Sequence, residues 1–166
     1  MTLEEMVDAY AVDVRRYLYR RLIGSADPAS TADDLTADVL VVAWRRRGDV
    51  PTGTELPWLY AVARRVLANY RRHPQDVLVA DLGELDAIDE ADPAEIVSDN
   101  AALAEAWRAI SARDREVLRL VAWEGLNGAQ LAAALGISEG GAAAALSRAR
   151  SRFVESLAGV QGTPTG

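Results

Sequence analysis

Tryptophan, arginine and asparagine side chains recur at helical spacing in residues 54–72. At about 100° per residue, an α-helix would place on one side a stripe made of Trp58, Val62, Arg65, Asn69 and Arg72, flanked by Arg64 and Arg71. An indole ring stacks on an unpaired base, a guanidinium binds phosphate and an amide pairs with a base edge. The stripe therefore predicts contact with single-stranded DNA. The alternative is a solvated basic face whose tryptophan folds back onto the core.

A second pattern, in residues 127–158, predicts a helix-turn-helix. Apolar residues are spaced to form a small core between two helices. Gly136 suits the turn because it tolerates a positive φ, and Ser138 can cap the helix that follows. In such a motif the second helix enters the major groove of DNA. An ordinary helical hairpin is the competing interpretation.

Residues 30–48 predict a helix that is apolar over more than half of its circumference. Its polar residues form a narrow stripe of Asp34, Asp38 and Arg45. Leu40 and Trp44 lie on a different side of the helix from the main apolar face. A helix of this kind either occupies the centre of a bundle or docks on a partner, and the two interpretations are compatible.

The elements that position these residues are all helical, and no convincing alternating strand is present. Helix starts and stops predict helices at about 3–23, 30–48, 54–72, 93–110, 112–124, 128–136 and 139–158. We expect an all-α protein with two small domains, 1–73 and 93–158, joined by an acidic linker over 74–92. Residues 159–166 form a tail that should fray.

The net charge of −7 argues at first against a nucleic-acid partner. The charge is unevenly placed, however: residues 1–73 hold 11 Arg and 10 acids, and residues 106–166 hold 7 Arg and 5 acids. Residues 74–105 hold 10 acids and no basic residue, so the excess acidity lies in the middle of the chain. We expect weak affinity for free DNA rather than none.

Several classes of protein are disfavoured by composition. The chain has no cysteine, which excludes disulfides, thiolate zinc sites and thiol redox centres. It has a single histidine, His73, and its acids concentrate in a polar segment that cannot perturb their pKa values by burial. We therefore expect no enzymatic activity, no metal and no cofactor. The lack of a signal peptide and of a long apolar run predicts a cytoplasmic protein without membrane insertion.

Taken together, the two halves resemble the extracytoplasmic-function (ECF) class of sigma-70-type sigma factors. Residues 32–46, which end in Ala43-Trp44-Arg45-Arg46, look like the acidic helix of region 2, and residues 57–72 are similar to its promoter-melting helix. Residues 113–118, 124–126, 135–139 and 146–150 resemble region 4.

The resemblance implies a sigma factor with core RNA polymerase and promoter DNA as partners; an anti-sigma factor is a frequent further partner in the family. The polymerase contacts would be Asp34, Asp38, Leu40, Trp44 and Arg45. The loop at 48–56 and the third helix would melt the −10 element, with contacts from Trp58, Val62, Arg64, Arg65, Asn69, Arg71 and Arg72. The last helix would read the −35 element with Ser138, Glu139, Gly140, Ser147, Arg148, Arg150 and Arg152.

Two departures from the family pattern shape the alternatives. The recognition helix begins Gly140-Gly141 and continues with four alanines, where basic residues are common, so we expect weak or unusual −35 recognition. Ala37 and Val42 replace polar residues that are usual in the polymerase-binding helix. The main alternative is a sigma-like adaptor that acts through protein contacts with little or no −35 reading. A plain helix-turn-helix repressor is less favoured because of the region 2-like half.

Overall fold

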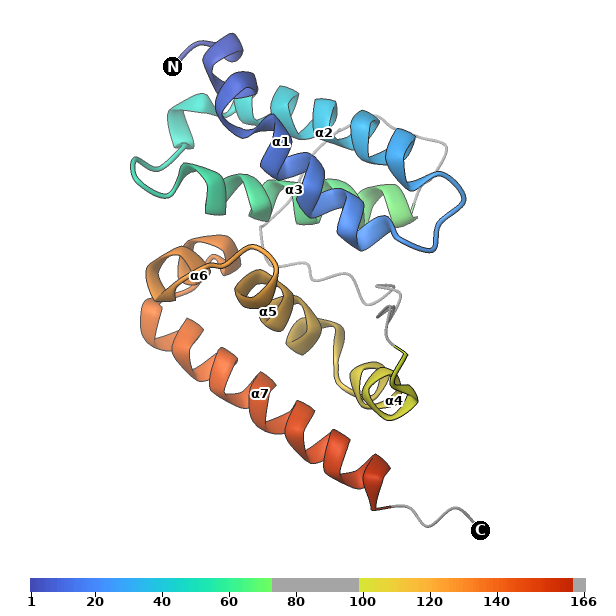
Figure 1. Cartoon of the computed structure of the whole chain (residues 1–166). Coiled ribbons are helices and arrows are strands. Elements are labelled where there is room, and N and C mark those ends of the chain that lie inside the picture. Colours follow the sequence, from blue (N-terminus) through green and yellow to red (C-terminus); the bar gives the residue numbers. More distant parts are fainter. Residues whose placement is uncertain (73–98, 163–166) are drawn as a thin grey trace. The chain divides into compact units, whose positions relative to one another are not determined.

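The computed structural model describes residues 1–72 and 99–162, and its regular elements are helices (Figure 1). The helices are α1 (Leu3–Leu22), α2 (Pro28–Arg45), α3 (Glu55–Arg72), α4 (Ala101–Ala109), α5 (Ala112–Ala122), α6 (Gly128–Leu135) and α7 (Glu139–Gln161). The all-α prediction is confirmed for these residues. The acidic linker at 74–92 and the predicted helix start at 93 lie outside them. The chain divides into two compact units, with α1–α3 in the first and α4, α5 and α7 in the second.

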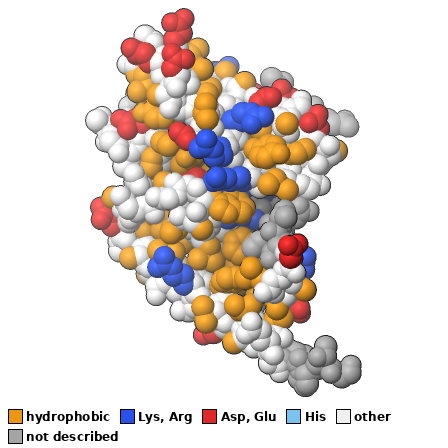
Figure 2. Space-filling view, viewed as in Figure 1, with side chains coloured by type: hydrophobic (Ala, Val, Ile, Leu, Met, Phe, Trp, Pro, Cys, Tyr) orange, Lys and Arg blue, Asp and Glu red, His pale blue; other side chains and the backbone are white. Residues whose placement is uncertain are grey.

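In the first unit each of the three helices packs on the other two (Figure 1). Thr2 and Glu5 form a capping box that starts α1, and acidic side chains gather where this helix begins (Figure 2). Further along α1, the ring of Tyr17 stacks on Tyr60 of α3 with centroids 5.1 Å apart, and the Arg21 guanidinium lies 3.5 Å from the Tyr17 ring centre. This stack fixes α1 against α3.

The second helix begins earlier and ends earlier than predicted. Asp27 accepts a hydrogen bond from the Ser30 amide, and Pro28 occupies the first turn, so the helix starts two residues before the predicted position at 30. The α-helix ends at Arg45, and a short 3-10 turn follows over Arg47–Asp49, in which the Asp49 amide donates to the Arg46 carbonyl at 2.8 Å. The chain passes from the α-helix through this 3-10 turn into the loop before α3.

In the second unit α7 packs on α4 and α5. The ring of Phe153 meets Trp107 edge-on with centroids 5.9 Å apart, and the Ser156 hydroxyl donates to the Ala106 carbonyl at 3.2 Å. The predicted continuous helix over 93–110 is wrong at its middle: Asn100 has an extended backbone and caps α4 by accepting from the Leu103 amide. Asn100 therefore starts a separate helix seven residues after the predicted start at 93.

The predicted helix-turn-helix is present. Asn127 and Gln130 cap α6 reciprocally, each side chain accepting from the other's amide at 3.1 Å. Gly136 has a φ of +67°, as the turn requires, and Ser138 caps α7 by accepting from the Gly141 amide. The last helix runs to Gln161, beyond the predicted end near 158, because it continues through Gly159 and the Gly162 amide still donates to the Ala158 carbonyl.

Candidate functional site

The outer face of α2, defined here as Asp34, Ala37, Asp38, Val41 and Arg45, combines both charges with an apolar side chain. Four of these residues are exposed and Asp38 is half-buried. Val41 is 44% exposed and was missed in the sequence, although its spacing from Asp34, Asp38 and Arg45 is that of one helical stripe. Leu40, which was predicted to contact the polymerase, is 7% exposed and packs in the core.

Asp38 is the most unusual group on this face. Its partial burial, followed by the charge of Asp34, raises the pKa of the Asp38 carboxyl above its usual value. The buried Oδ2 atom has no hydrogen-bond partner among the residues that the structure describes. Burial of a carboxylate oxygen without such a partner carries a desolvation cost, which agrees with the raised pKa.

The C-terminal end of α2 gathers indole rings and guanidinium groups. The Arg47 guanidinium lies over the Trp44 ring, 4.4 Å from its centre, and that of Arg46 lies 5.8 Å from the ring centre of Trp58. Trp44 is half-buried and Arg47 is exposed. Basic groups are favourable at this helix end because of the negative pole of the helix dipole.

A hydrogen bond from a backbone amide to a carboxylate holds the end of the loop between α2 and α3. Gly53 has a φ of +88°, and its amide donates to Glu55 Oε1 at 2.9 Å. This hydrogen bond lowers the pKa of the Glu55 carboxyl. The Thr54 carbonyl accepts from the Trp58 amide, which starts α3 at the predicted position.

The predicted stripe on α3 does not lie wholly in solvent. Trp58, Val62, Arg64 and Arg65 are buried, Asn69 and Arg71 are half-buried, and Arg72 is exposed. The N-terminal half of the stripe is therefore not exposed in this structure, and its contact with single-stranded DNA stays a prediction. In the C-terminal half, Arg71 Nη2 donates to the Arg21 carbonyl at 2.9 Å, which satisfies a carbonyl in the last turn of α1.

The residues predicted to contact the −35 element lie on α7, apart from Ser138, which caps this helix. Ala142, Ala145 and Ala149 are buried, whereas Glu139, Gly140, Ser147, Arg148 and Arg150 are exposed. Ser138 is also exposed, but its hydroxyl is used in the cap. In the described residues Arg148 and Arg150 have no acidic partner within ion-pairing distance. The exposed face thus carries few charges and mostly small side chains.

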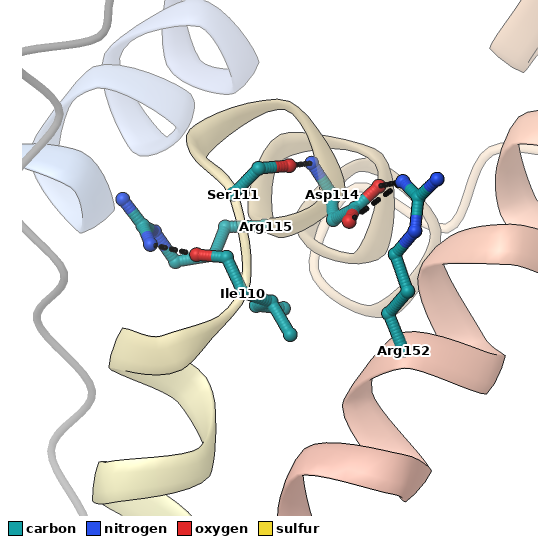
Figure 3. Close-up of polar contacts among 5 residues, drawn as sticks. All are labelled: Ile110, Ser111, Asp114, Arg115 and Arg152. Atoms are coloured by element: carbon teal, nitrogen blue, oxygen red, sulfur yellow. Dashed lines mark hydrogen bonds and ion pairs between the residues drawn. The ribbon is translucent and has the colours of Figure 1, made fainter.

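Arg152 is held by an acid of α5 (Figure 3). Its Nη1 atom lies 3.1 Å from both carboxylate oxygens of Asp114. The Asp114 amide donates to the Ser111 hydroxyl, which caps α5, while the Asp114 carboxylate pairs with Arg152. Nearby, Arg115 Nη1 donates to the Ile110 carbonyl at 2.6 Å and satisfies the end of α4.

Two further kinds of site were sought over residues 1–72 and 99–162. No helix in this part of the chain is long and apolar enough to cross a membrane. The same residues contain no group of three or more His, Cys, Asp or Glu side chains arranged to hold a metal ion.

A family model of known proteins matches each of the two units. The family model described as Sigma-70 region 2 matches residues 6–76, and that described as Sigma-70, region 4 matches residues 101–153. The first match spans α1–α3 and the second spans α4 to the middle of α7.

Individual relatives carry the same description. The chain is 34% identical over 142 residues to the ECF RNA polymerase sigma factor BldN of Streptomyces coelicolor, covering 81% of this chain and 52% of BldN, so it spans about half the length of that relative. It is 28% identical over 156 residues to the ECF RNA polymerase sigma factor SigM of Bacillus subtilis, covering 92% of this chain and 93% of SigM.

A solved structure shows the same fold. The sigma factor RpoE of Bartonella quintana, solved in complex with the anti-sigma factor NepR, matches with a TM-score of 0.55 at 23% identity, covering 93% of this chain and 95% of that one. The order of the two regions, their match to α1–α3 and α4–α7 and the ECF relatives agree with one another. The chain therefore belongs to the ECF class of the sigma-70 family.

Proposed function

We propose that this protein binds core RNA polymerase and directs promoter recognition, melting of the −10 element and transcription initiation. The observation that carries the proposal is the presence of region 2 and region 4 in one chain, in that order. The family consists of transcription initiation factors rather than enzymes. We extend this to the chain itself: it acts without catalytic activity or a cofactor of its own, in the cytoplasm.

We infer that the polymerase binds the outer face of α2. Asp34, Arg45 and Val41 supply charge and apolar area in solvent, and the half-buried carboxylate of Asp38 lies on the same face. Leu40 supports this face from the core rather than touching the partner. In this proposal residues 1–73 form the polymerase- and −10-binding domain, 93–158 the −35-binding domain, 74–92 the linker and 159–166 the tail.

We infer that α3 and the preceding loop open the −10 element. Arg72 is exposed and Asn69 is half-buried, whereas Trp58, Val62 and Arg65 are buried in the structure. Unstacked bases need a stacking surface and hydrogen-bond partners to remain open, and this group supplies both. Arg71 acts indirectly, through its hydrogen bond to the end of α1.

We infer that α7 enters the major groove of the −35 element. Arg148 and Arg150 supply its charge, and Arg152 is engaged by Asp114. Two exposed arginines give little affinity for free DNA, so promoter binding depends on the polymerase. The small number of exposed arginines on α7 also favours the alternative, an adaptor with weak or no −35 reading. An anti-sigma factor stays a prediction from the family resemblance.

Capture of promoter fragments tests the proposal. The full chain is incubated with core polymerase and a pool of genomic promoter fragments, and retained fragments are sequenced, with core alone as the control. We expect a small set of fragments that share −10 and −35 sequences. The variant Arg148→Gln/Arg150→Gln should retain fewer fragments while binding core normally. Core binding without fragment enrichment would support the adaptor, and failure to bind core would contradict both functions.

A further inference from the structure

α1 carries most of the exposed hydrophobic side chains in the part of the chain that the structure describes. Six of the eight large ones lie at positions 1–23, namely Met1, Leu3, Val7, Val12, Tyr19 and Ile23. Figure 2 shows hydrophobic and arginine side chains next to one another on the front of the first unit, where α1 lies in Figure 1. Single exposed apolar residues are ordinary on a protein surface, but their concentration on one helix indicates contact with another molecule.

Part of this set lies on the side of α1 that points away from the core. The outer stripe of α1, as we define it, consists of Val12, Arg16, Tyr19 and Ile23, which fall within about 60° of one another at about 100° per residue. The buried Val14 lies on the opposite side of the helix. Val12 is 67% exposed, and Tyr19 and Ile23 are 38% and 37% exposed. The stripe is therefore an apolar surface that packs against nothing in its own unit.

The charges of α1 are divided between its two halves. All acids of this helix lie at or before residue 13, and all of its arginines lie at or after residue 15. The helix dipole favours this order only within the first and last turns, and Asp13, Arg15 and Arg16 lie in the middle. Arg16 pairs with Asp13 and Arg15 pairs with Asp33 of α2, but exposed ion pairs of this kind contribute little to stability. The division of charge thus has no sufficient cause within the folded unit.

A second copy of this chain matches both properties of the helix. When two such helices pack antiparallel, the acidic half of each faces the basic half of the other, and the apolar residues of the two stripes meet between them. A partner with one sign of charge, such as a nucleic acid, would match only one half. A two-fold symmetric contact requires one self-complementary surface, and the divided charge of α1 makes its surface self-complementary.

We propose that two copies of the free chain associate through the outer stripe of α1, with the helices antiparallel and the two-fold axis near the middle of the helix. Val12 of one copy then lies against Arg16 and Tyr19 of the other. The inference does not rest on the proposed function. A helix of 20 residues is about 30 Å long and 10 Å wide, so the contact covers roughly 300 Å² per copy. Stable interfaces cover about 800 Å² per partner, so we expect a weak dimer.

Sedimentation equilibrium of the full chain, from about 10 μM to about 1 mM, tests the association. We expect the average mass to rise from one copy towards two, and to rise less at high salt because the two charged halves are then screened. Val12→Thr/Tyr19→Gln should raise the dissociation constant by about tenfold or more. Val154→Thr is the matched control, because this valine of α7 is similarly exposed, at 63%, and lies outside the stripe. Circular dichroism checks that each variant keeps its helices.

Cross-linking tests the orientation of the two helices. The chain has no cysteine, so a single introduced thiol reports on one position. Arg16→Cys lies near the proposed axis and should cross-link to itself through a short bis-maleimide. Ala9→Cys should not, because the two copies of residue 9 would lie about 15 Å or more apart along the axis. It should instead cross-link to Tyr19→Cys when the two variants are mixed.

Several results would overturn the inference. A monomer at every concentration would exclude the dimer, and if Val12→Thr/Tyr19→Gln then assembled poorly with core polymerase, the stripe would be a polymerase contact. A dimer that Val12→Thr/Tyr19→Gln leaves intact would use another surface. Self-cross-linking of Ala9→Cys as strong as that of Arg16→Cys, or a dissociation constant that does not rise with salt, would contradict the antiparallel pairing of charges.

Discussion

Arg152 of α7 and Asp114 of α5 form an ion pair in which one guanidinium nitrogen donates to both carboxylate oxygens at 3.1 Å (Figure 3). The Asp114 side chain is 6% exposed and that of Arg152 is 55% exposed. The pair therefore joins α7 to α5, in addition to the contacts that Phe153 and Ser156 make with α4.

Breaking this pair should destabilise the second unit. Arg152→Gln leaves a buried carboxylate without its cationic partner, so we expect the free energy of unfolding to fall by about 1–3 kcal/mol. Urea denaturation followed by circular dichroism measures the change. Asp114→Asn/Arg152→Gln should recover much of the loss because no buried charge remains. Arg150→Gln, an exposed arginine of the same helix, should stay within about 0.5 kcal/mol of the unmodified chain.

Asp38 should show opposite effects on stability and on polymerase binding. Its pKa is raised in the folded chain, chiefly by burial, so the folded state favours the protonated form. The contribution of protonation to stability is full below the usual Asp pKa and is lost as the pH rises through the raised value. Asp38→Asn should therefore raise the Tm near pH 7 and leave it unchanged near pH 3.

The same substitution should weaken assembly with core polymerase, because the amide replaces a charged acceptor on the outer face of α2. Thermal unfolding at several pH values and a binding titration with core measure the two effects. Asp8→Asn, an exposed carboxylate of α1, is the control and should change neither quantity. A Tm gain that is equal at both pH values would contradict the assigned cause of the pKa shift.

The paired glycines at the start of α7 should respond differently to alanine. A Cβ on Gly140 meets no atom within 4 Å, so Gly140→Ala should stabilise the helix by up to about 1 kcal/mol. A Cβ on Gly141 would lie 3.1 Å from the Ser138 Oγ atom that caps the helix. We therefore expect a smaller gain or a loss for Gly141→Ala. Chemical denaturation of the two variants side by side tests this order, and equal gains would show that the cap adjusts freely.

The exposed arginines of α7 should control the salt dependence of promoter binding. Removing one arginine that binds a phosphate lowers the magnitude of the slope of log K against log salt concentration by about 0.9. If Arg148 and Arg150 each meet a phosphate, Arg148→Gln/Arg150→Gln should reduce the slope for the holoenzyme by about 1.8. Arg108→Gln, at the exposed end of α4, should leave it unchanged. A weaker preference for one −35 base at constant slope would instead assign Arg148 to base reading.

Local signals predicted most of the helices but not the contacts between distant residues. Ser111, Asn127 and Ser138 each cap the helix that follows, because capping depends on residues within one turn. The partner of Asp114 could not be predicted, since Arg152 lies 38 residues away and reaches it only after α7 packs on α5. The cap at Asn100 was not predicted, because the sequence placed a continuous helix over 93–110.

For the functional surfaces, too, the sequence predicted what depends on helical spacing but not what depends on contacts between helices. The acids and Arg45 on α2 follow from helical spacing, and Val41 would have followed from the same spacing had apolar residues been included in the stripe. The burial of Trp58 and Arg65 could not be derived, because a projection of α3 shows which residues share a side but not what covers it. The roles of Arg71 and Arg152 depend on backbone and side-chain partners in other helices.

Promoter-specific run-off transcription tests the central claim most directly. Core polymerase is supplied with the full chain and a captured promoter template, and RNA length and start site are measured. We predict a transcript of defined length that is absent with core alone and on a template whose −10 element has been replaced. Stable assembly with core but no promoter-dependent transcript on any captured template would contradict the assignment of this chain as an initiating sigma factor.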